Sequence, residues 1–283
     1  MNCGEPFEPA WSLSRKHLRA FCPRAALLRY RDAPRGAAPD APASLQAVFS
    51  AAKMVPDGKF IRELLLHTMK RAFCHGCRRA SELLPAALRT LEQRFAGIMT
   101  GNAAAIPFSA WSEGVPDETA KRRFAAEISA RTERIVAAGG WQTLLEIPPE
   151  CRRILPEVLR INAGDLACFA SPLCAATSRG RLLMIELREG DFDDAAMETA
   201  LLHRLYAANR LGRMPDALDS FVLESRTGEL RRFGGEKDHA EALRRISAEI
   251  GGWAALAAVP SEEIPGNEGA CPQCVFAGIC HDR

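Results

Sequence analysis

Hydrophobic residues in the first half of the chain recur at helical spacing. Ser12 and Ser14 are both suited to cap a first helix, which continues through Leu18 and Phe21 towards Leu28. The same periodicity predicts further helices at about 44–53, 58–77, 80–97 and 117–138. Three prolines and a glycine between residues 32 and 43 indicate a loop there.

The pattern changes after Gly139-Gly140. Short segments rich in branched residues, bounded by Pro, Gly and Asn, predict strands at 143–148, 154–161, 164–170 and 181–188. We expect a helix at 193–211, two strands within 221–233 joined at 226–228, and a last helix at 237–257. This order predicts an α/β or α+β fold with one central mixed β-sheet flanked by helices.

Composition is consistent with one integrated globular unit. The chain has 283 residues, 47% hydrophobic and 25% charged, which excludes global disorder. We divide it into a helical N-terminal region (1–140), an α/β core (141–258) and a C-terminal cysteine segment (259–283). No apolar run reaches the roughly 18 residues of a membrane span, and the N-terminus has no signal pattern. We therefore expect a cytoplasmic protein with no membrane partner.

Positive charge is concentrated in the first half of the chain. The net charge is +2, yet residues 15–94 hold 16 Lys and Arg against 6 Asp and Glu. A basic half suggests an anionic partner, most often nucleic acid. The alternative is a solvated helical surface.

The ten cysteines include a compact C-terminal group, Cys271, Cys274 and Cys280. Three thiols within ten residues suit an iron–sulfur cluster or zinc, and both normally take four ligands. Cys22, which precedes Pro23, is the best candidate for the fourth, and it would join the two ends of the chain. The alternative is a zinc knuckle that uses His281.

Cys74 and Cys77 also have ligand spacing. Beside them, His67 and His75 are the nearest further ligands, so we favour two ordinary thiols over a second metal site. The other cysteines are interpreted as loop or core thiols: Cys3, Cys151, Cys168 and Cys174.

Two carboxylates, Asp165 and Glu186, lie in segments that we expect to be adjacent strands. Carboxylates so placed share a divalent cation such as Mg²⁺. Arg188 would lie on the same face as Glu186, because side chains alternate along a strand. Such a set suits metal-assisted phosphodiester hydrolysis. The alternative is a turn residue, Asp165, and an exposed strand pair formed by Glu186 and Arg188.

The N-terminal segment Trp11–Arg24, followed by Leu28-Arg29-Tyr30, resembles the opening of the iron–sulfur RecB-like nucleases of the PD-(D/E)XK superfamily. These are related to the CRISPR adaptation nucleases and to AddB-type repair nucleases. Their opening combines a Ser-containing helix start with Cys-Pro-Arg and a Tyr. The terminal Cys-x2-Cys-x5-Cys also fits, and the resemblance covers essentially the full chain. It implies a restriction-endonuclease-like core.

The resemblance also implies cofactors and site residues. A [4Fe–4S] cluster would be held by Cys22, Cys271, Cys274 and Cys280, and would join the N- and C-termini. In an active enzyme, Asp165 and Glu186 would bind Mg²⁺ or Mn²⁺. Arg188 would steady the scissile phosphate, and Tyr206 would orient the site.

Three positions depart from the family pattern. Arg62 stands where the family has a metal-binding His, and Arg188 replaces a Lys. Leu202 replaces the Gln of the family's Gln-x3-Tyr motif, which ends here at Tyr206. Arginine stays protonated and is a poor base, although it still binds phosphate.

Three functions follow from these observations. The first is a metal-dependent DNA nuclease of DNA repair or mobile-element defence, working with a helicase or another repair or defence protein. The second is a catalytically inactive nuclease-fold module that binds DNA or a partner protein. The third is a zinc-stapled structural protein without a nucleic-acid role.

Overall fold

The computed structural model describes residues 7, 9–103, 105–107, 109, 118–155, 158–190, 195–212, 217–233 and 239–281. The helices are α1 (Leu13–Phe21), α2 (Pro23–Leu27), α3 (Ala33–Arg35), α4 (Ala43–Ala52), α5 (Asp57–His75), α6 (Ala80–Met99), α8 (Glu118–Ala137), α9 (Gly139–Leu145), α10 (Ala196–Leu211), α11 (His239–Ala257) and α12 (Ala277–His281). The strands are β1 (Ala10–Trp11), β2 (Met54–Val55), β3 (Ile106–Pro107), β4 (Arg152–Ile154), β5 (Leu159–Ala163), β6 (Leu166–Ala170), β7 (Cys174–Ser178), β8 (Arg181–Arg188), β9 (Leu218–Glu224) and β10 (Leu230–Phe233). None of the described helices combines the length and apolarity needed to cross a membrane.

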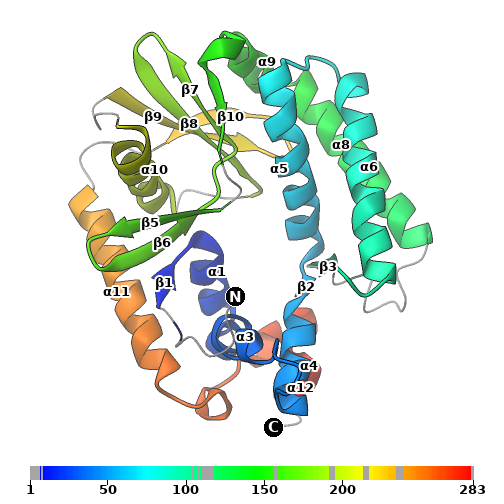
Figure 1. Ribbon diagram of the computed structural model, residues 1–283, viewed down its shortest axis with the longest axis vertical. Helices are drawn as coiled ribbons and strands as arrows, with labels where there is room; N and C mark the ends of the chain where they lie inside the picture. Colours follow the sequence, from blue (N-terminus) through cyan, green and yellow to red (C-terminus); the bar gives the residue numbers. More distant parts are fainter. Residues whose placement is uncertain are drawn as a thin grey trace.

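A five-stranded mixed sheet lies at the centre of the molecule, in the order β10-β9-β8-β7-β4 (Figure 1). The β8 and β9 strands are parallel, and the other neighbouring pairs are antiparallel. Two consecutive parallel strands need a crossover, and α10 provides it. The expected mixed α/β class is therefore confirmed.

Alternating residues of β8 face two different hydrophobic cores. Ile185 and Leu187 point into a core shared with α5, α6, α8 and α9. Leu182 and Met184 point into a second core shared with α10, α11 and the β5–β6 hairpin. Both faces of the sheet are thus covered, as the side-chain alternation of a strand requires.

The expectation of a single sheet was wrong in part. Strands β5 and β6 pair with each other and with β1, forming a separate three-stranded sheet. β1 runs parallel to β6, with Ala10 opposite Ala167 and Trp11 opposite Cys168. The pattern of branched residues marks these strands, but it does not specify their pairing partners. A two-residue strand from the N-terminus occupies the edge of β6 instead.

The strand expected at 143–148 was also wrong, because the segment begins as helix α9. Trp141, Leu144 and Leu145 lie at helical spacing and are all buried in the first core. Position 140 of this helix needs a glycine because the β9–β10 hairpin packs closely against its backbone. A Cβ there would lie 2.7 Å from Leu230 Cβ and 2.8 Å from the Gly228 oxygen. The Gly139-Gly140 pair therefore does two things. It begins helix α9, and its second glycine permits close packing against the β9–β10 hairpin.

The two ends of the chain pack against each other. Residues of α2 and α4 share a small core with the C-terminal segment, through Cys22, Val48 and Phe276 among others. Asn267 Nδ2 donates a 2.8 Å hydrogen bond to the Phe21 oxygen. Figure 1 shows α3, α4 and α12 together at one end of the molecule.

Polar contacts join β1 and α1 to helices α10 and α11, which cover the second core. Lys16 Nζ lies 2.8 Å from Glu198 Oε1, whose side chain is fully buried on α10. Trp11 Nε1 donates a 3.0 Å hydrogen bond to Glu249 Oε2 on α11. Arg19 donates to the Glu249 backbone oxygen at 3.1 Å. The N-terminal helices are thereby anchored on elements from the middle and the end of the chain.

The contact of Gly140 with the hairpin is testable. We expect Gly140→Ala to lower the free energy of unfolding by about 1–3 kcal/mol, because backbone atoms must shift to admit the methyl group. Gly139→Ala is the matched control. Its Cβ meets nothing within 4 Å, so it should leave stability unchanged or slightly higher. Urea denaturation of both variants would measure this. Equal effects would contradict the packing described.

Candidate functional site

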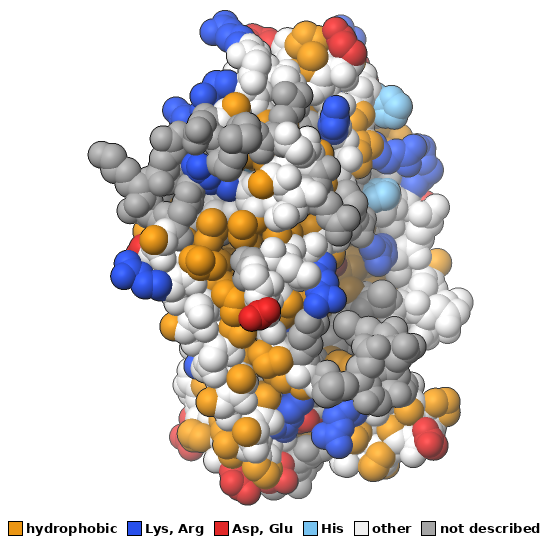
Figure 2. All heavy atoms as spheres, turned by 60° about the vertical axis from the view of Figure 1, so that its left-hand side comes forward, with side chains coloured by type: hydrophobic (Ala, Val, Ile, Leu, Met, Phe, Trp, Pro, Cys, Tyr) orange, Lys and Arg blue, Asp and Glu red, His pale blue; other side chains and the backbone are white. Residues whose placement is uncertain are grey.

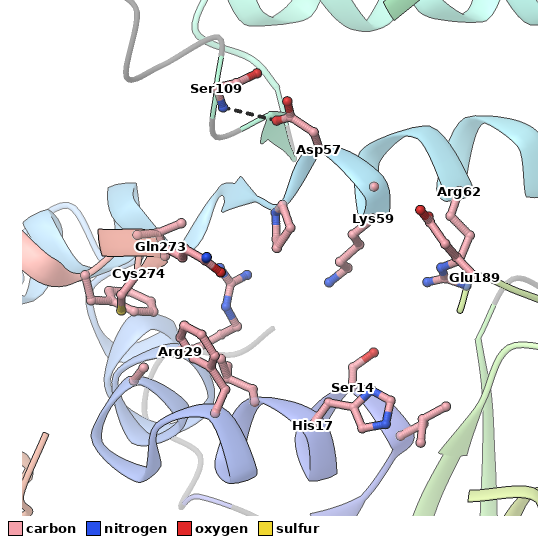
Figure 3. Close-up of a pocket in the computed structure, with 18 of the residues that line it drawn as sticks. Ser14, His17, Arg29, Asp57, Lys59, Arg62, Ser109, Glu189, Gln273 and Cys274 are labelled. Atoms are coloured by element: carbon pink, nitrogen blue, oxygen red, sulfur yellow. Dashed lines mark hydrogen bonds between the residues drawn. The ribbon is translucent and has the colours of Figure 1, made fainter. Parts of the chain in front are cut away.

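A cavity of about 660 Å³ lies where the chain ends meet the central sheet. Four segments line it: residues 13–30 from α1, α2 and the π-helical turn after α2, residues 56–62 at the start of α5, residues 188–189 at the end of β8, and residues 272–276 of the C-terminal segment. Ser109 completes its described lining. Distant parts of the sequence thus line one cavity (Figure 3).

Helix α1 brings two polar side chains to the cavity, Ser14 and His17. The helix is capped by Ser12, whose Oγ accepts a 3.2 Å hydrogen bond from the Arg15 backbone N–H. This confirms the expected helix start. The cap leaves Ser14 and His17 one turn apart on the exposed side, and Figure 3 shows them on the wall of the cavity across from Lys59.

The start of α5 supplies two cations, Lys59 and Arg62. They project into the cavity from the first turns of a 19-residue helix, whose first N–H groups have no acceptor within the helix. Burial lowers the pKa of Lys59. Glu63 opposes this shift, whereas the positive charges of Arg29 and Arg62 add to it. The cations of the cavity therefore repel one another.

Arg29 enters the cavity from the opposite side. Its Nη1 and Nη2 donate to the Ala52 oxygen at 2.9 Å and the Met54 oxygen at 2.6 Å. The guanidinium also lies over the Phe276 ring, 5.6 Å from its centre. Burial lowers the pKa of Arg29, although nearby Tyr30, Cys274 and Glu63 favour its charged form. These contacts hold a positive charge at a fixed position.

The end of β8 carries a buried ion pair. Glu186 is 1% exposed, and its Oε2 lies 3.2 Å from Arg188 Nη2. Burial alone would raise the pKa of Glu186. Arg188, His203 and the more distant Arg62 outweigh burial, so the net pKa lies below its ordinary value. Glu186 is therefore held as a carboxylate whose charge is already compensated.

His203 on α10 contacts Glu186, and the sequence analysis did not single it out. Its Nε2 lies 3.2 Å from Glu186 Oε1, and its Nδ1 lies 3.0 Å from Ser220 Oγ. The tautomer with the proton on Nε2 donates to Glu186 and accepts from the Ser220 hydroxyl. His203 follows Leu202, the position of the family's Gln, and that adjacency is the signal that could have found it.

Glu189 lies beside the start of α5. Arg131 on α8 contacts both of its carboxylate oxygens, at 2.9 and 3.1 Å. A Cβ on Gly58 would lie 3.1 Å from Glu189 Oε2, so glycine allows the carboxylate to approach the helix N-terminus, where negative charge is stabilised. On the other side of this helix start, Asp57 Oδ1 accepts a 3.1 Å hydrogen bond from the Ser109 N–H.

The structure separates Asp165 from Glu186. Asp165 is exposed in the turn of the β5–β6 hairpin, after Gly164 with φ +61°, whereas Glu186 is buried in the five-stranded sheet. The expectation of adjacent strands was therefore wrong. The turn explains it, because β6 begins only at Leu166 and pairs outside the central sheet. Tyr206 is buried in the second core on α10.

The four cysteines singled out from the sequence do come together. Cys274 interacts electrostatically with Cys22, Cys271 and Cys280. Burial raises the pKa of the Cys274 thiol, a hydrogen bond with the Phe276 backbone lowers it, and the three neighbouring thiols raise it further. Four cysteine thiols are the donor set that an iron–sulfur cluster or zinc takes.

These thiols are not arranged as a closed metal site. Among the described residues, no three His, Cys, Asp or Glu side chains are grouped tightly enough to hold a metal ion. Binding of a metal would therefore require the four sulfur atoms to move closer together. Cys74 and Cys77 lie at the end of α5, where burial raises the pKa of both thiols. They remain interpreted as ordinary thiols.

The buried ion pair makes stability depend on pH. We expect Glu186→Gln to lower the free energy of unfolding by about 3–5 kcal/mol at pH 7, because it leaves Arg188 buried without its carboxylate. The pKa of Glu186 is lower in the folded chain than its ordinary value of 4.5. Its contribution is therefore present above that pH and lost as the pH falls through the folded pKa.

The gap in stability between wild type and Glu186→Gln should accordingly narrow below pH 4.5. Denaturant titrations from pH 7 to pH 3 would measure it. Glu118→Gln, at a site 75% exposed, is the control and should change stability little. If wild type and Glu186→Gln were equally stable at pH 7, or if their difference stayed constant down to pH 3, the ion pair of Glu186 with Arg188 would not stabilise the fold as described.

Comparison with protein-family models gave no match, and comparison with curated protein sequences gave none either.

Proposed function

We propose that the chain is a DNA-binding protein of the RecB-like iron–sulfur nuclease type, with a restriction-endonuclease-like core and a silent hydrolytic site. The observation that carries this proposal is the cavity. Three segments that the family resemblance singles out meet there: Gly58–Arg62, Arg188 with Glu186 behind it, and the C-terminal cysteine segment. Their joint position is what a nuclease site of this type requires.

The sheet supports the same interpretation. The β7–β8 hairpin is followed by α10 and by the parallel strand β9. Glu186 and Arg188 lie near the end of the central strand of this unit, one above the other on the same face. This is where a Glu-x-basic motif would have to lie to act on a phosphate in the cavity.

The electrostatics of Glu186 favour a site without metal-dependent hydrolysis. A divalent cation takes several carboxylate oxygens, whereas the neighbour of Glu186 on β9 is Val222. Arg188 already lies 3.2 Å from the carboxylate, and Arg62 occupies the family's His position. A divalent metal ion at Glu186 would be repelled by Arg188 and Arg62 or would have to displace them. The donor set thus does not fit Mg²⁺ or Mn²⁺.

Cys22, Cys271, Cys274 and Cys280 would hold a [4Fe–4S] cluster. Their convergence on Cys274 supports this assignment. The cluster would supply four iron–sulfur bonds that link the N-terminal helices to the C-terminal segment, which constrains the unfolded chain. Cys22 is placed for this by the break between α1 and α2, where its Sγ lies 3.5 Å from the Ala25 N–H. Zinc is the alternative occupant.

Much of the basic charge of the first half has structural partners. Arg19, Arg29 and Arg31 all donate to backbone carbonyl groups. On the face shown in Figure 2, hydrophobic side chains gather in the middle, acidic ones lie mostly towards the lower end, and Lys and Arg side chains are scattered between them. The cations that point into the cavity are therefore the stronger candidates for contacts with DNA. A helicase or another repair or defence protein would be the partner expected of this type of module.

The cluster assignment predicts iron content. Protein purified without oxygen should be brown and hold about four iron atoms per chain. Cys22→Ser should lose most of the iron and unfold at a lower temperature, because one of the four cluster ligands is removed. Cys151→Ser, a partly buried cysteine outside the group, is the matched control and should keep its iron. Colourless protein with stoichiometric zinc would overturn the iron–sulfur assignment.

The silent-site assignment predicts binding without cleavage. Labelled single- and double-stranded DNA should stay intact with Mg²⁺ or Mn²⁺, while a gel-shift assay detects binding that weakens linearly with the logarithm of salt concentration. The reference variant is Asp165→Ala/Glu186→Ala. Metal-dependent cleavage that disappears in this variant would show an active nuclease. Absence of any DNA binding would overturn the proposed function itself.

A further inference from the structure

The cavity holds more positive than negative charge. Among its described lining residues, Arg29, Lys59, Arg62 and Arg188 are cationic, and two side chains are acidic. The cations also act on one another: Arg29 and Arg62 lower the pKa of Lys59, and Arg62 lowers that of Arg188. Repulsion of this kind is relieved when an anion enters between the charges.

Both acidic groups of the lining already have partners outside the set of four cations. Arg131 contacts the two oxygens of Glu189, and Asp57 accepts from the Ser109 N–H with Arg123 at 3.9 Å. The ion-pair partner of Lys59 is Glu63 at the long distance of 3.9 Å. Within the described part of the chain, Arg62 makes no hydrogen bond and no ion pair. Lys59 and Arg62 are therefore available to a ligand.

The geometry places these charges around one space. Figure 3 shows Lys59 and Arg29 extending into the cavity from opposite walls, with Ser14 and His17 on the wall across from Lys59. Lys59 and Arg62 are one helical turn apart at the start of α5, whose N-terminus favours an anion. An anion between them would meet ammonium, guanidinium and hydroxyl donors together.

The rest of the cavity is apolar. Leu18, Phe21, Tyr30 and Phe276 belong to its lining. Its volume of about 660 Å³ is within the usual range for pockets that bind small organic ligands. Phe276 is buried beneath Arg29, whereas Phe21 and Tyr30 are partly exposed. Partly exposed rings of this kind stack on a nucleobase. The pocket therefore combines a cationic half with an aromatic half, which suits a ligand with a phosphate at one end and a flat ring at the other.

We propose that this cavity binds a nucleotide phosphomonoester, with the phosphate between Lys59 and Arg62 and the base against the aromatic half. A monoester fits better than an internal phosphodiester, because it carries nearly two negative charges and can pair with both cations. The group has two sources: a free mononucleotide, or the phosphorylated end of a DNA strand. The second source deepens the proposed DNA-binding function and rests on it, whereas the first does not.

Fluorescence anisotropy tests the strand source. Three single-stranded oligonucleotides of one sequence carry a phosphate at the 5′ end, at the 3′ end or at neither, and an internal label. We expect one phosphorylated strand to bind about tenfold more tightly than the unphosphorylated strand. Calorimetry with thymidine 5′-monophosphate and with thymidine tests the free source, and the phosphate should again be required.

Lys59→Gln and Arg62→Gln should each abolish this preference, so that the phosphorylated and unphosphorylated strands bind the variant with equal affinity. Lys121→Gln, an exposed lysine of α8, is the matched control and should keep the preference. Circular dichroism would verify that each variant is folded.

The outcomes separate the two proposals. Equal affinity for all three strands, with no thymidine 5′-monophosphate binding, would overturn the phosphomonoester site while DNA binding stands. Absence of all strand binding, with thymidine 5′-monophosphate bound through Lys59, would overturn the DNA-binding function and support the site. A preference that survives both glutamine variants would also overturn the site.

Discussion

Packing of the two chain ends against each other is the constraint on which the candidate site depends. The cavity is closed on one side by α1 and α2 and on another by residues 272–276, so it exists only while these segments stay in contact. The contact is a small apolar core with few large side chains. Hydrogen bonds reinforce it, including that from Asn267 to the Phe21 oxygen. A core of this size gains much from a covalent or metal link.

The break between α1 and α2 shows how local chemistry serves this contact. Pro23 at the first position of α2 has no N–H to offer the preceding helix and begins a new one. Cys22 is left extended between the helices, with its side chain 5% exposed and turned into the core shared with the C-terminal segment. The same break directs Arg29 towards Phe276 and the cavity. A two-residue sequence thus positions both a proposed cluster ligand, Cys22, and a cavity cation, Arg29.

Sequence periodicity predicted the long elements well and their assembly poorly. The helices α4, α5, α6, α8 and α11 and the strand β8 begin and end within about two residues of expectation, because each buries a continuous face. The short helix α9 was misread, since Gly140 serves a contact that the sequence does not display. Spacing singled out Cys271, Cys274 and Cys280, and Cys22 was added because it precedes Pro23 and fits the family resemblance.

The carboxylate site was the least predictable part. Asp165 and Glu186 are both typical metal ligands, but strand pairing places them in different sheets. His203 was missed because its role depends on the crossover of α10, which brings it over Glu186 and Ser220. Lys59 was visible only as a member of the basic half, and Arg62 was visible as the residue at the family's His position. Their shared cavity arises from tertiary packing.

The central claim is that four cysteines from the two chain ends form one cluster beside the cavity. Anomalous diffraction at the iron absorption edge, from crystals of protein purified without oxygen, tests it most directly. The account predicts one strong peak within bonding distance of the sulfur atoms of Cys22, Cys271, Cys274 and Cys280. Iron bound by other residues, or a peak only at the zinc edge, would contradict it.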